Sequence, residues 1–429
     1  MDGKKGLRIL HTADWHLGKT LCERSRDPEM ARFLDWLLKV LEEEQIDILL
    51  IAGDVFDTIS PTHAAQQMYY NFLGRLNRET ACRHVVVTAG NHDSGAFLDA
   101  PAMPLEAVQT HVIGLPREKP EDELLVLKDD DGRPELLVAA VPFLREHEVL
   151  TAQGGESITD KEQRLGKFVA DRYQALAAAV KEKREEFGTA IPAVAMGHLF
   201  AQGGKSGDSE RTLYIGSLGQ IAPQSISAPE FAYTALGHLH RPQDVAGVHN
   251  MRYSGSPLAM GFAEAAYPKS VTIFSPADNK TAIREVPVWQ YMETLTGDWD
   301  AIAARLEVLK REIAENPDAF PRLKENGEKI WLKIVQTGTQ YGGMLRQKLE
   351  EAVQDAPLDV LMMKDETALA EESRLEETET KNLRQLGYLE VFKRVLAEKK
   401  VPEAEQDGLT AMYKEICGCL NLEGGNENN

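Results

Sequence analysis

The sequence has little cysteine and no long hydrophobic run. Its four cysteines, Cys22, Cys82, Cys417 and Cys419, are not spaced as zinc ligands and do not suggest a disulfide framework. No apolar run approaches the roughly 18 residues that a membrane span requires. The apolar stretch that follows the first residues is too short for the core of a signal peptide. We therefore expect a cytoplasmic protein with reduced thiols and no membrane partner.

The sequence also lacks the excess of positive charge that is typical of a DNA-binding protein. Its 68 acidic residues outnumber 48 basic ones, so the formal net charge is −20. A protein that binds DNA by itself usually has a basic surface, and the charge taken alone argues against nucleic acid. Bound divalent cations and a basic partner protein can, however, supply a positive field locally. The acidic balance therefore does not exclude DNA as a substrate.

The length and texture of the chain predict more than one domain. At 429 residues the chain is too long for one ordinary hydrophobic core. Short β-branched runs alternate with helical patterns over residues 1–285, which predicts α/β layers. The order strand, helix, strand, helix, strand over residues 286–366 predicts a small α/β domain. A glutamate-rich stretch at 365–379 is typical of a solvated linker, and amphipathic patterns predict helices within 380–420.

Five short polar motifs each follow a predicted strand. Four of them place a glycine directly before the polar group, where the backbone can turn sharply and approach a ligand closely. Ligands of open α/β sheets bind beyond the carboxyl ends of the strands. We therefore expect the five motifs to meet in one site. They are Asp14-Trp15-His16, Gly53-Asp54-Val55-Phe56-Asp57, Gly90-Asn91-His92-Asp93, Gly197-His198 and Gly237-His238-Leu239-His240.

The residue types in these motifs favour a pair of divalent cations. Imidazole, carboxylate and amide oxygen together suit Mn, Fe or Zn better than Mg, which prefers oxygen ligands alone. Each motif by itself is weak, because Asp-x-His is usually a turn or a cap and a Gly-His pair carries little information. The five motifs in order, each after a buried strand, predict a metal site. One carboxylate can bridge two ions about 3.5–4 Å apart, and such a pair can hold a phosphate and activate water.

The five motifs in this order resemble the calcineurin-like metallophosphoesterase superfamily. Longer stretches, at residues 11–18, 53–57, 237–241 and 253–257, resemble its SbcD branch of bacterial nuclease subunits, and the resemblance covers nearly the whole chain. It implies a four-layer metallophosphoesterase β-sandwich of the α/β class, flanked by helices. It also implies that the small α/β domain at 286–366 is a cap that contacts DNA.

The resemblance assigns ligands to two divalent metal ions, with Mn²⁺ as the expected metal. The assignment is carried over only to residues that match the motifs. The implied ligands are Asp14, His16 and His240 for one ion, Asn91, His198 and His238 for the other, and Asp54 as the bridge between them.

Three further motif residues lie outside this ligand set. The resemblance places His92 beside the scissile phosphate, where it assists the leaving oxygen. We expect Asp93 to orient the His92 ring, as carboxylates orient catalytic imidazoles elsewhere. Some relatives have a second catalytic histidine at the position of Asp57. An aspartate stands there in this chain, so we assign Asp57 no proton-donor role; a structural hydrogen-bond acceptor is the alternative.

The resemblance implies a metal-dependent DNA nuclease of repair and recombination. In complex with an SbcC-type ABC ATPase it would act as an ATP-dependent exonuclease on double strands and as an endonuclease on single strands and hairpins. A homodimer within a heterotetramer is the implied assembly. Leu389, Val391, Phe392 and Leu396 form an apolar side of a predicted helix within 380–420, which could dock on the coiled coil of the ATPase or pack on its own chain.

Two other functions stay open. The first is a stand-alone phosphodiesterase or phosphatase of the same fold. The Ser/Thr phosphatase branch usually has Asp-Arg-Gly after the second motif, whereas Thr58 and Ile59 follow Asp57 here. The second is a binding scaffold with an inactive site, which the presence of all seven ligand residues disfavours.

A short glycine-rich stretch resembles a nucleotide-binding loop but does not match its pattern. Gly203-Gly204-Lys205-Ser206 follows a predicted strand. The phosphate-binding loop requires a glycine five residues before the second glycine, and Leu199 stands there. We therefore expect a loop near His198 and no hydrolysis of ATP by this chain alone.

Overall fold

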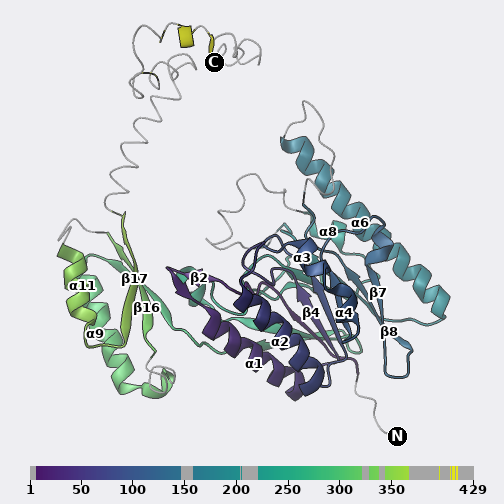
Figure 1. The fold of residues 1–429 in the computed structure, drawn as a ribbon, viewed down its shortest axis with the longest axis horizontal. Coiled ribbons are helices and arrows are strands. Elements are labelled where there is room, and N and C mark those ends of the chain that lie inside the picture. The colour runs from purple at the N-terminus through teal and green to yellow at the C-terminus, as the bar shows by residue number, and fades with distance from the viewer. Residues whose placement is uncertain are drawn as a thin grey trace. The chain divides into compact units, whose positions relative to one another are not determined.

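The computed structural model describes residues 6–145, 158–202, 204, 221–320, 328–337, 344–366 and a few positions between 396 and 413 (Figure 1). The chain forms two compact units. One comprises Met1–Thr294, Arg311–Lys333 and Val353–Met362, and the other Leu295–Lys310, Ile334–Ala352 and Met363–Asn429. Most of the predicted linker and C-terminal helices, and most of the 203–206 stretch, lie outside the described residues. None of the described helices is both long and apolar enough to cross a membrane.

Two six-stranded sheets form the centre of the first unit. In each sheet four neighbouring strands are parallel; the first sheet is extended at one end by two strands joined through antiparallel pairings, and the second by one antiparallel strand at each end. The first sheet has the order β14 (Lys280–Glu285), β13 (Ser270–Ser275), β1 (Ile9–Thr12), β4 (Ile48–Ala52), β5 (His84–Thr88), β6 (Thr110–Ile113). The second has the order β11 (Gln243–Asp244), β12 (Met251–Tyr253), β10 (Tyr233–Gly237), β9 (Ala193–His198), β8 (Pro134–Ala140), β7 (Leu124–Lys128). A separate ribbon pairs β2 (Thr20–Leu21) with β3 (Arg24–Ser25).

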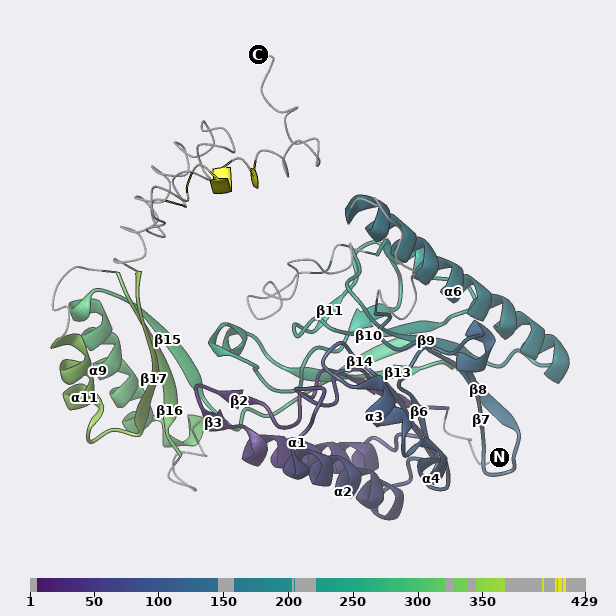
Figure 2. The same cartoon turned by 45° about the horizontal axis from the view of Figure 1, so that its top comes forward.

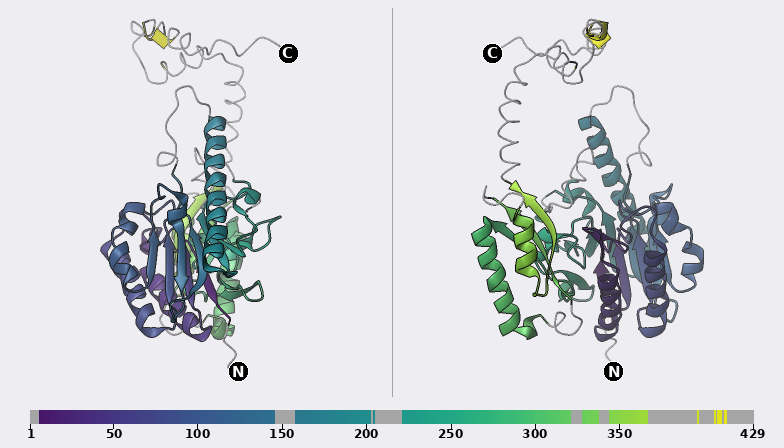
Figure 3. Two further views of the ribbon diagram at one scale, coloured as in Figure 1. Left: turned by 90° about the vertical axis from the view of Figure 1, so that its right-hand side faces the viewer. Right: turned by 60° about the vertical axis from the view of Figure 1, so that its left-hand side comes forward.

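Helices cover the outer face of each sheet, so this unit has four layers. α1 (Asp27–Glu43) and α2 (His63–Glu79) run side by side on the first sheet (Figure 2). α6 (Ile158–Phe187) and the short α8 (Pro223–Ile226) cover the second sheet on the opposite side (Figure 3). Shorter helical segments lie in the connections. They are α3 (Gly95–Asp99), α4 (Ala102–Glu106), η1 (Pro120–Glu123) and η3 (Phe262–Ala266).

The strand β4 shows why the sheets lie in the interior. Leu49 and Ile51 pack toward α1 and α2, whereas Ile48, Leu50 and Ala52 pack between the two sheets. Successive side chains of a strand point to opposite faces, so a strand that is covered on both sides needs apolar residues throughout. The buried strand that the sequence predicted before the second motif is thus covered on both faces. With helices on both outer faces, the predicted α/β class is confirmed.

Local sequence signals mark the start of both helices that cover the first sheet. α2 starts at His63, and the Thr62 hydroxyl accepts a hydrogen bond from the Ala65 amide at 3.2 Å, a typical N-cap contact. α1 starts at Asp27, three residues before the apolar stripe that begins at Met30. Pro28 stands in its first turn, where a proline leaves no hydrogen bond unmade.

The three-stranded sheet, whose residues fall partly in each unit, has the predicted element order. It consists of β15 (Met292–Gly297), β16 (Ile330–Gln336) and β17 (Leu358–Asp365), with helices α9 (Trp299–Glu315) and α11 (Leu345–Val353) and the short η4 (Pro317–Ala319) in the connections. The first strand begins at Met292, six residues after the predicted start of this domain. The domain limits 1–285 and 286–366 remain predictions.

The two described cysteines should differ strongly in reactivity. Cys82 is buried, and burial raises the pKa of its thiol to about 12, whereas Cys22 is half-exposed. Because the thiolate is the reactive form, iodoacetamide at pH 8 should modify Cys22 and leave Cys82 intact in the folded protein. Peptide mass spectrometry measures both sites. Both should react in denaturant, and equal rates in the folded state would contradict this assignment.

Candidate metal centre

The seven predicted ligand residues come from the carboxyl ends of five neighbouring strands. β1, β4 and β5 are adjacent in the first sheet, and β9 and β10 are adjacent in the second. Gly237 at the end of β10 is in register with His198 at the end of β9. Since the two sheets pack face to face, the five strand ends meet at one edge of the sandwich. The convergence that the motifs predicted is therefore present.

One half of the site is formed by Asp14, His16 and His240. A donor atom from each lies within 4.8 Å of the other two. The Nε2 atoms of His16 and His240 face each other at 3.2 Å. All three side chains are buried.

The other half is formed around Asn91. Its Oδ1 atom lies 3.1 Å from His198 Nε2 and 2.9 Å from His238 Nδ1. Asp54 lies between the two halves, because its Oδ2 atom is 3.3 Å from His198 Nε2 and 3.7 Å from His16 Nε2. The structure thus brings all seven residues together.

The backbone at the site is held in a conformation that side chains disfavour. Asp14, His16, Asp54 and His238 all have positive φ, at 54°, 49°, 50° and 102°. A non-glycine residue in this region costs on the order of 1–3 kcal/mol and persists only where its surroundings enforce it. Here the Asp14 amide donates to the Gly53 carbonyl and the His16 amide to the Asp54 carbonyl, both at 3.0 Å. Four such residues in one cluster indicate that the strain serves a function.

Comparison with known proteins agrees with this geometry. Residues 7–242 match the calcineurin-like phosphoesterase family, and residues 288–400 match the family described as type 5 capsule protein repressor C-terminal domain. A relative from Escherichia coli K12, which is named as the SbcD component of the nuclease SbcCD, is 34% identical over 411 residues, which cover 95% of this chain and 97% of the relative. The chain belongs to the SbcD family of calcineurin-like phosphoesterases.

Other SbcD proteins match a shorter part of the chain. The protein of the same name from Bacillus subtilis 168 is 39% identical over 269 residues, covering 62% of this chain and 66% of the relative. The one from Rhodobacter capsulatus is 37% identical over 288 residues, covering 66% and 69%. The recognition of the SbcD family from the motifs is thereby confirmed, and the chain is a phosphodiester hydrolase by family.

The donor set of this SbcD chain fits divalent cations. Asp14 Oδ1 accepts a hydrogen bond from the His238 amide at 2.9 Å, but its buried Oδ2 has no hydrogen-bond partner among the described residues. Buried carboxylate oxygens are normally paired. This unpaired oxygen faces the imidazole nitrogens of the site. The Nε2 atoms of His16 and His240 are 3.2 Å apart, and both cannot act as donors to each other. A cation in their midst would satisfy oxygen and nitrogens together.

Two of the histidines are in the neutral form that metal binding requires. At His198 burial would lower the pKa, but the carboxylate of Asp54 outweighs burial and raises the pKa to about 9, so that a cation would displace the ring proton. Burial lowers the pKa of His16 to about 4 and that of His238 to about 3, so both rings are neutral at pH 7 and keep a lone pair. Burial would raise the pKa of Asp54, but the neighbouring His198 outweighs burial and holds the pKa well below its usual range. Neutral imidazoles beside an ionised carboxylate are the forms that bind a transition-metal ion.

His92 lies at the rim of the cluster and is held by contacts to the Asp54–Asp57 loop. Its amide donates to Asp54 Oδ1 at 2.8 Å, and its ring Nδ1 lies 2.9 Å from the Asp57 carbonyl oxygen. The ring stands edge-on to His16, with the centroids 4.8 Å apart. A donor on Nδ1 leaves Nε2 as the atom that can face a substrate.

The structure corrects the role expected for Asp93. Its carboxylate does not hold the His92 ring but accepts three backbone N–H bonds, from Gly90 at 2.9 Å, Val55 at 3.1 Å and Phe56 at 2.9 Å. The side chain is fully buried. These donors contact both carboxylate oxygens, and the partner of the His92 ring is the Asp57 carbonyl. Asp93 ties together the loops that carry Asp54 and Asn91.

Asp57 also contributes through its side chain. Oδ1 lies 3.3 Å from His16 Nδ1 and accepts a hydrogen bond from Lys19 Nζ at 2.8 Å. Burial would raise the pKa of Asp57, but the adjacent His16 ring and the hydrogen bond from Lys19 lower it to about 2. An ionised carboxylate cannot donate a proton at neutral pH, which supports the structural role that the sequence left as the alternative.

Glu264 and Lys269, which the sequence motifs did not indicate, lie behind His240. Glu264 Oε1 is 2.9 Å from His240 Nδ1, and Lys269 Nζ donates to the His240 carbonyl at 3.0 Å. Neither residue belongs to a metal-binding motif. The only signal was the family-like stretch at residues 253–257, since Ser256 contacts both side chains.

Gly237 should be irreplaceable because the two sheets approach each other at its α-carbon. A Cβ atom there would lie 1.9 Å from the Ala52 carbonyl oxygen and 2.7 Å from His198 Nδ1. We expect Gly237→Ala to lower the free energy of unfolding by at least about 1–3 kcal/mol and to weaken Mn²⁺ binding, because no rotamer change can move a Cβ. Thermal denaturation and Mn²⁺ titration measure the two effects.

Gly166 in α6 provides the matched control. A Cβ atom at Gly166 would meet nothing within 4 Å. Gly166→Ala should therefore leave metal binding unchanged and stabilise the helix by about 0.5–1 kcal/mol. If Gly237→Ala behaved like this control, the close approach at the site would be refuted.

Proposed function

We propose that this protein is the nuclease subunit of an SbcCD-type complex and hydrolyses phosphodiester bonds in DNA with two divalent cations, Mn²⁺ in the first place. The convergence of seven ligand-type side chains from five strand ends supports this most directly. Membership of the SbcD family supports DNA as the substrate, since its relatives bear the name of a nuclease subunit.

The two halves of the cluster divide the ligands between the two ions. Asp54 would be shared, as its position between the halves supports. When bound, the cations would supply Lewis acidity that polarises the phosphodiester and lowers the pKa of a water molecule. The other ligands would be Asp14, His16 and His240 for one ion and Asn91, His198 and His238 for the other.

His92 would act on the leaving oxygen. The Asp57 carbonyl occupies Nδ1 and thereby directs Nε2 outward, where it can donate a hydrogen bond or a proton to the oxygen as the P–O bond breaks. Arg145 also holds this loop, with Nη2 donating to the carbonyls of Asn91 at 3.0 Å and Asp93 at 2.7 Å. His92 is thus fixed before substrate binds, which lowers the reorganisation that the reaction requires.

A partner is part of the proposal because the chain is acidic. With a net charge of −20, most of the positive surface for DNA would come from an SbcC-type ATPase. The domain at 286–366 would contact DNA as a cap, and helices within 380–420 would dock on the coiled coil of the ATPase. ATP-dependent cutting, a homodimer within a heterotetramer and a cytoplasmic location complete the proposal.

A nuclease assay on defined DNA ends tests this function. We expect cleavage with Mn²⁺, less with Mg²⁺, and stimulation of double-strand cutting by the ATPase and ATP. Elemental analysis of the purified chain gives the number of ions bound. Hydrolysis of bis-p-nitrophenyl phosphate without cleavage of any DNA would favour the stand-alone phosphodiesterase or phosphatase instead. A chain that holds no metal would favour the scaffold.

A further inference from the structure

A buried polar cluster supports the ring of His240 from behind. Glu264 in η3, Lys269 directly before β13, and Ser256 after β12 are 2%, 7% and 0% exposed. Buried charges of this kind are rare unless they are paired. The cluster shares His240 with the candidate metal centre, so its purpose can be inferred from how it contacts that ring.

Glu264 divides its two carboxylate oxygens between His240 and Lys269. Oε1 lies 2.9 Å from His240 Nδ1. Oε2 accepts hydrogen bonds from Lys269 Nζ at 2.6 Å and from the Met260 amide at 3.1 Å. Burial would raise the pKa of Glu264, but Lys269 and the hydrogen bond with His240 hold it well below its usual range. Because Oε2 accepts from both an ammonium group and a backbone amide, the group that faces Nδ1 is an ionised carboxylate.

Lys269 anchors this carboxylate to the backbone of His240. Its ammonium group donates to Glu264 Oε2, to Ser256 Oγ at 2.8 Å and to the His240 carbonyl at 3.0 Å. An ammonium group has three hydrogens, and these three acceptors use all of them. Ring and backbone of His240 are thus held by one connected unit.

A carboxylate at Nδ1 decides what the other ring nitrogen can do. It favours the tautomer with the proton on Nδ1, which leaves a lone pair on Nε2 and makes that nitrogen more basic. His240 Nε2 is the atom that faces His16 Nε2 in the candidate metal centre. We propose that Glu264 and Lys269 are positioning residues that set the tautomer and orientation of His240 for one of the two metal ions. This inference rests on the proposed function.

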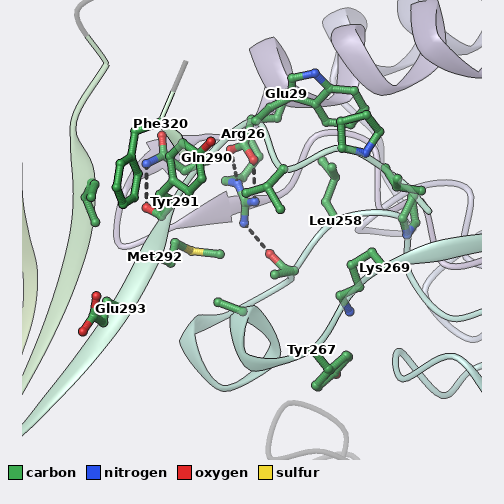
Figure 4. A pocket seen from close by; sticks show the side chains of 18 residues that line it. Arg26, Glu29, Leu258, Tyr267, Lys269, Gln290, Tyr291, Met292, Glu293 and Phe320 are labelled. Carbon is green, nitrogen blue, oxygen red and sulfur yellow. Dashed lines mark hydrogen bonds and ion pairs between the residues drawn. The ribbon is translucent and has the colours of Figure 1, made fainter. Parts of the chain in front are cut away.

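A second buried ion pair in the same domain supplies a matched control. Arg26 donates to both carboxylate oxygens of Glu29 and, at 2.8 Å, to the Ala259 carbonyl. Figure 4 shows this pair and Lys269 among the residues that line a pocket of about 200 Å³. Glu29 is 6% exposed and contacts a cation as Glu264 does, but its bonded partner is Arg26 and not a histidine.

The test is a titration of the full chain with Mn²⁺, with the free ion followed by electron paramagnetic resonance. We expect the unmodified protein to bind two ions. Glu264→Gln should weaken one of them by about 10–100-fold, the usual effect of removing an outer partner of a metal-binding histidine. The other ion should keep its affinity, and Glu29→Gln should leave both unchanged. If Glu264 only stabilised the fold, Glu264→Gln would lower the affinity for both ions equally or for neither.

Nitrogen NMR of histidine-labelled, metal-free protein gives a second measurement. His240 should carry its proton on Nδ1 in the unmodified chain and in Glu29→Gln, and should populate the other tautomer in Glu264→Gln. If that variant folds poorly because Lys269 is left unpaired, the double variant Glu264→Gln/Lys269→Met removes both buried charges. It should show the same selective loss of one ion.

The outcomes separate this inference from the proposed function. Two ions bound with native affinity in Glu264→Gln or in the double variant, with an unchanged tautomer, would overturn the inference and leave the metal centre standing. A chain that binds no Mn²⁺ even without substitution would overturn the proposed function and the inference together.

Discussion

Replacement of His92 by alanine is expected to lower DNA cleavage by about 10²–10⁴-fold, the usual contribution of a general acid or base. Both metal ions should stay bound, because the contacts of His92 are to the Asp54 carboxylate through its amide and to the Asp57 carbonyl through its ring. The amide contact survives in the variant. Single-turnover cleavage of a labelled duplex measures the rate, and elemental analysis measures the metal content.

His111 serves as the control for this prediction. It is a half-buried histidine on β6 whose ring contacts His84, away from the motif loops. His111→Ala should cleave DNA at close to the native rate. If His92→Ala lost metal together with activity, its role would be that of a ligand and the proposed action on the leaving oxygen would fall.

Replacement of Asp54 by asparagine should remove metal and activity together. The carboxylate lies within 3.7 Å of histidine nitrogens from both halves of the site, and it also accepts the His92 amide. Loss of an outer partner of a metal ligand already costs about 10–100-fold in affinity or activity, so a residue shared by both ions should cost more. Because asparagine has nearly the same size as aspartate, this substitution removes the charge without changing the packing of the side chain.

Asp47 provides the comparison at the opposite end of the same strand. It precedes β4 and pairs with Arg83 at 3.0 Å, far from the carboxyl end that carries Asp54. Asp47→Asn should bind Mn²⁺ and cleave DNA normally. Two ions retained at native affinity in Asp54→Asn would show that Asp54 does not bridge them.

Local sequence was sufficient for the strands that carry the motifs. The apolar run before Gly53 could only be a strand covered on both faces, and the polar residues that follow it had to lie at the strand end. The same reasoning did not place β13. That strand pairs with β1, with Ile9 opposite Phe274, and its partner lies more than 250 residues away in the chain. Strands that are so far apart in the chain show no local sequence pattern that would reveal their pairing.

Adjacency in sequence was misleading at Asp93. Because Asp93 follows His92 directly, a contact between the two side chains was the natural expectation. The carboxylate instead points inward to the amides of Val55 and Phe56, and a backbone carbonyl holds the imidazole. Consecutive side chains in a loop can point in different directions. The partner of the His92 ring is therefore set by the backbone carbonyl that lies beside it in the folded chain.

The amino-acid sequence by itself determined the α/β class and the five polar motifs at the strand ends, because period, turn chemistry and residue type are local properties, and the family resemblance selected the seven ligand residues within those motifs. Only the tertiary structure decided how those side chains are supported. Asp93, Asp57 and the Glu264–Lys269 pair act through hydrogen bonds whose geometry depends on the packing of distant loops. Hydrogen bonds are short and directional, so the exact partner is known only when the two sheets are in place.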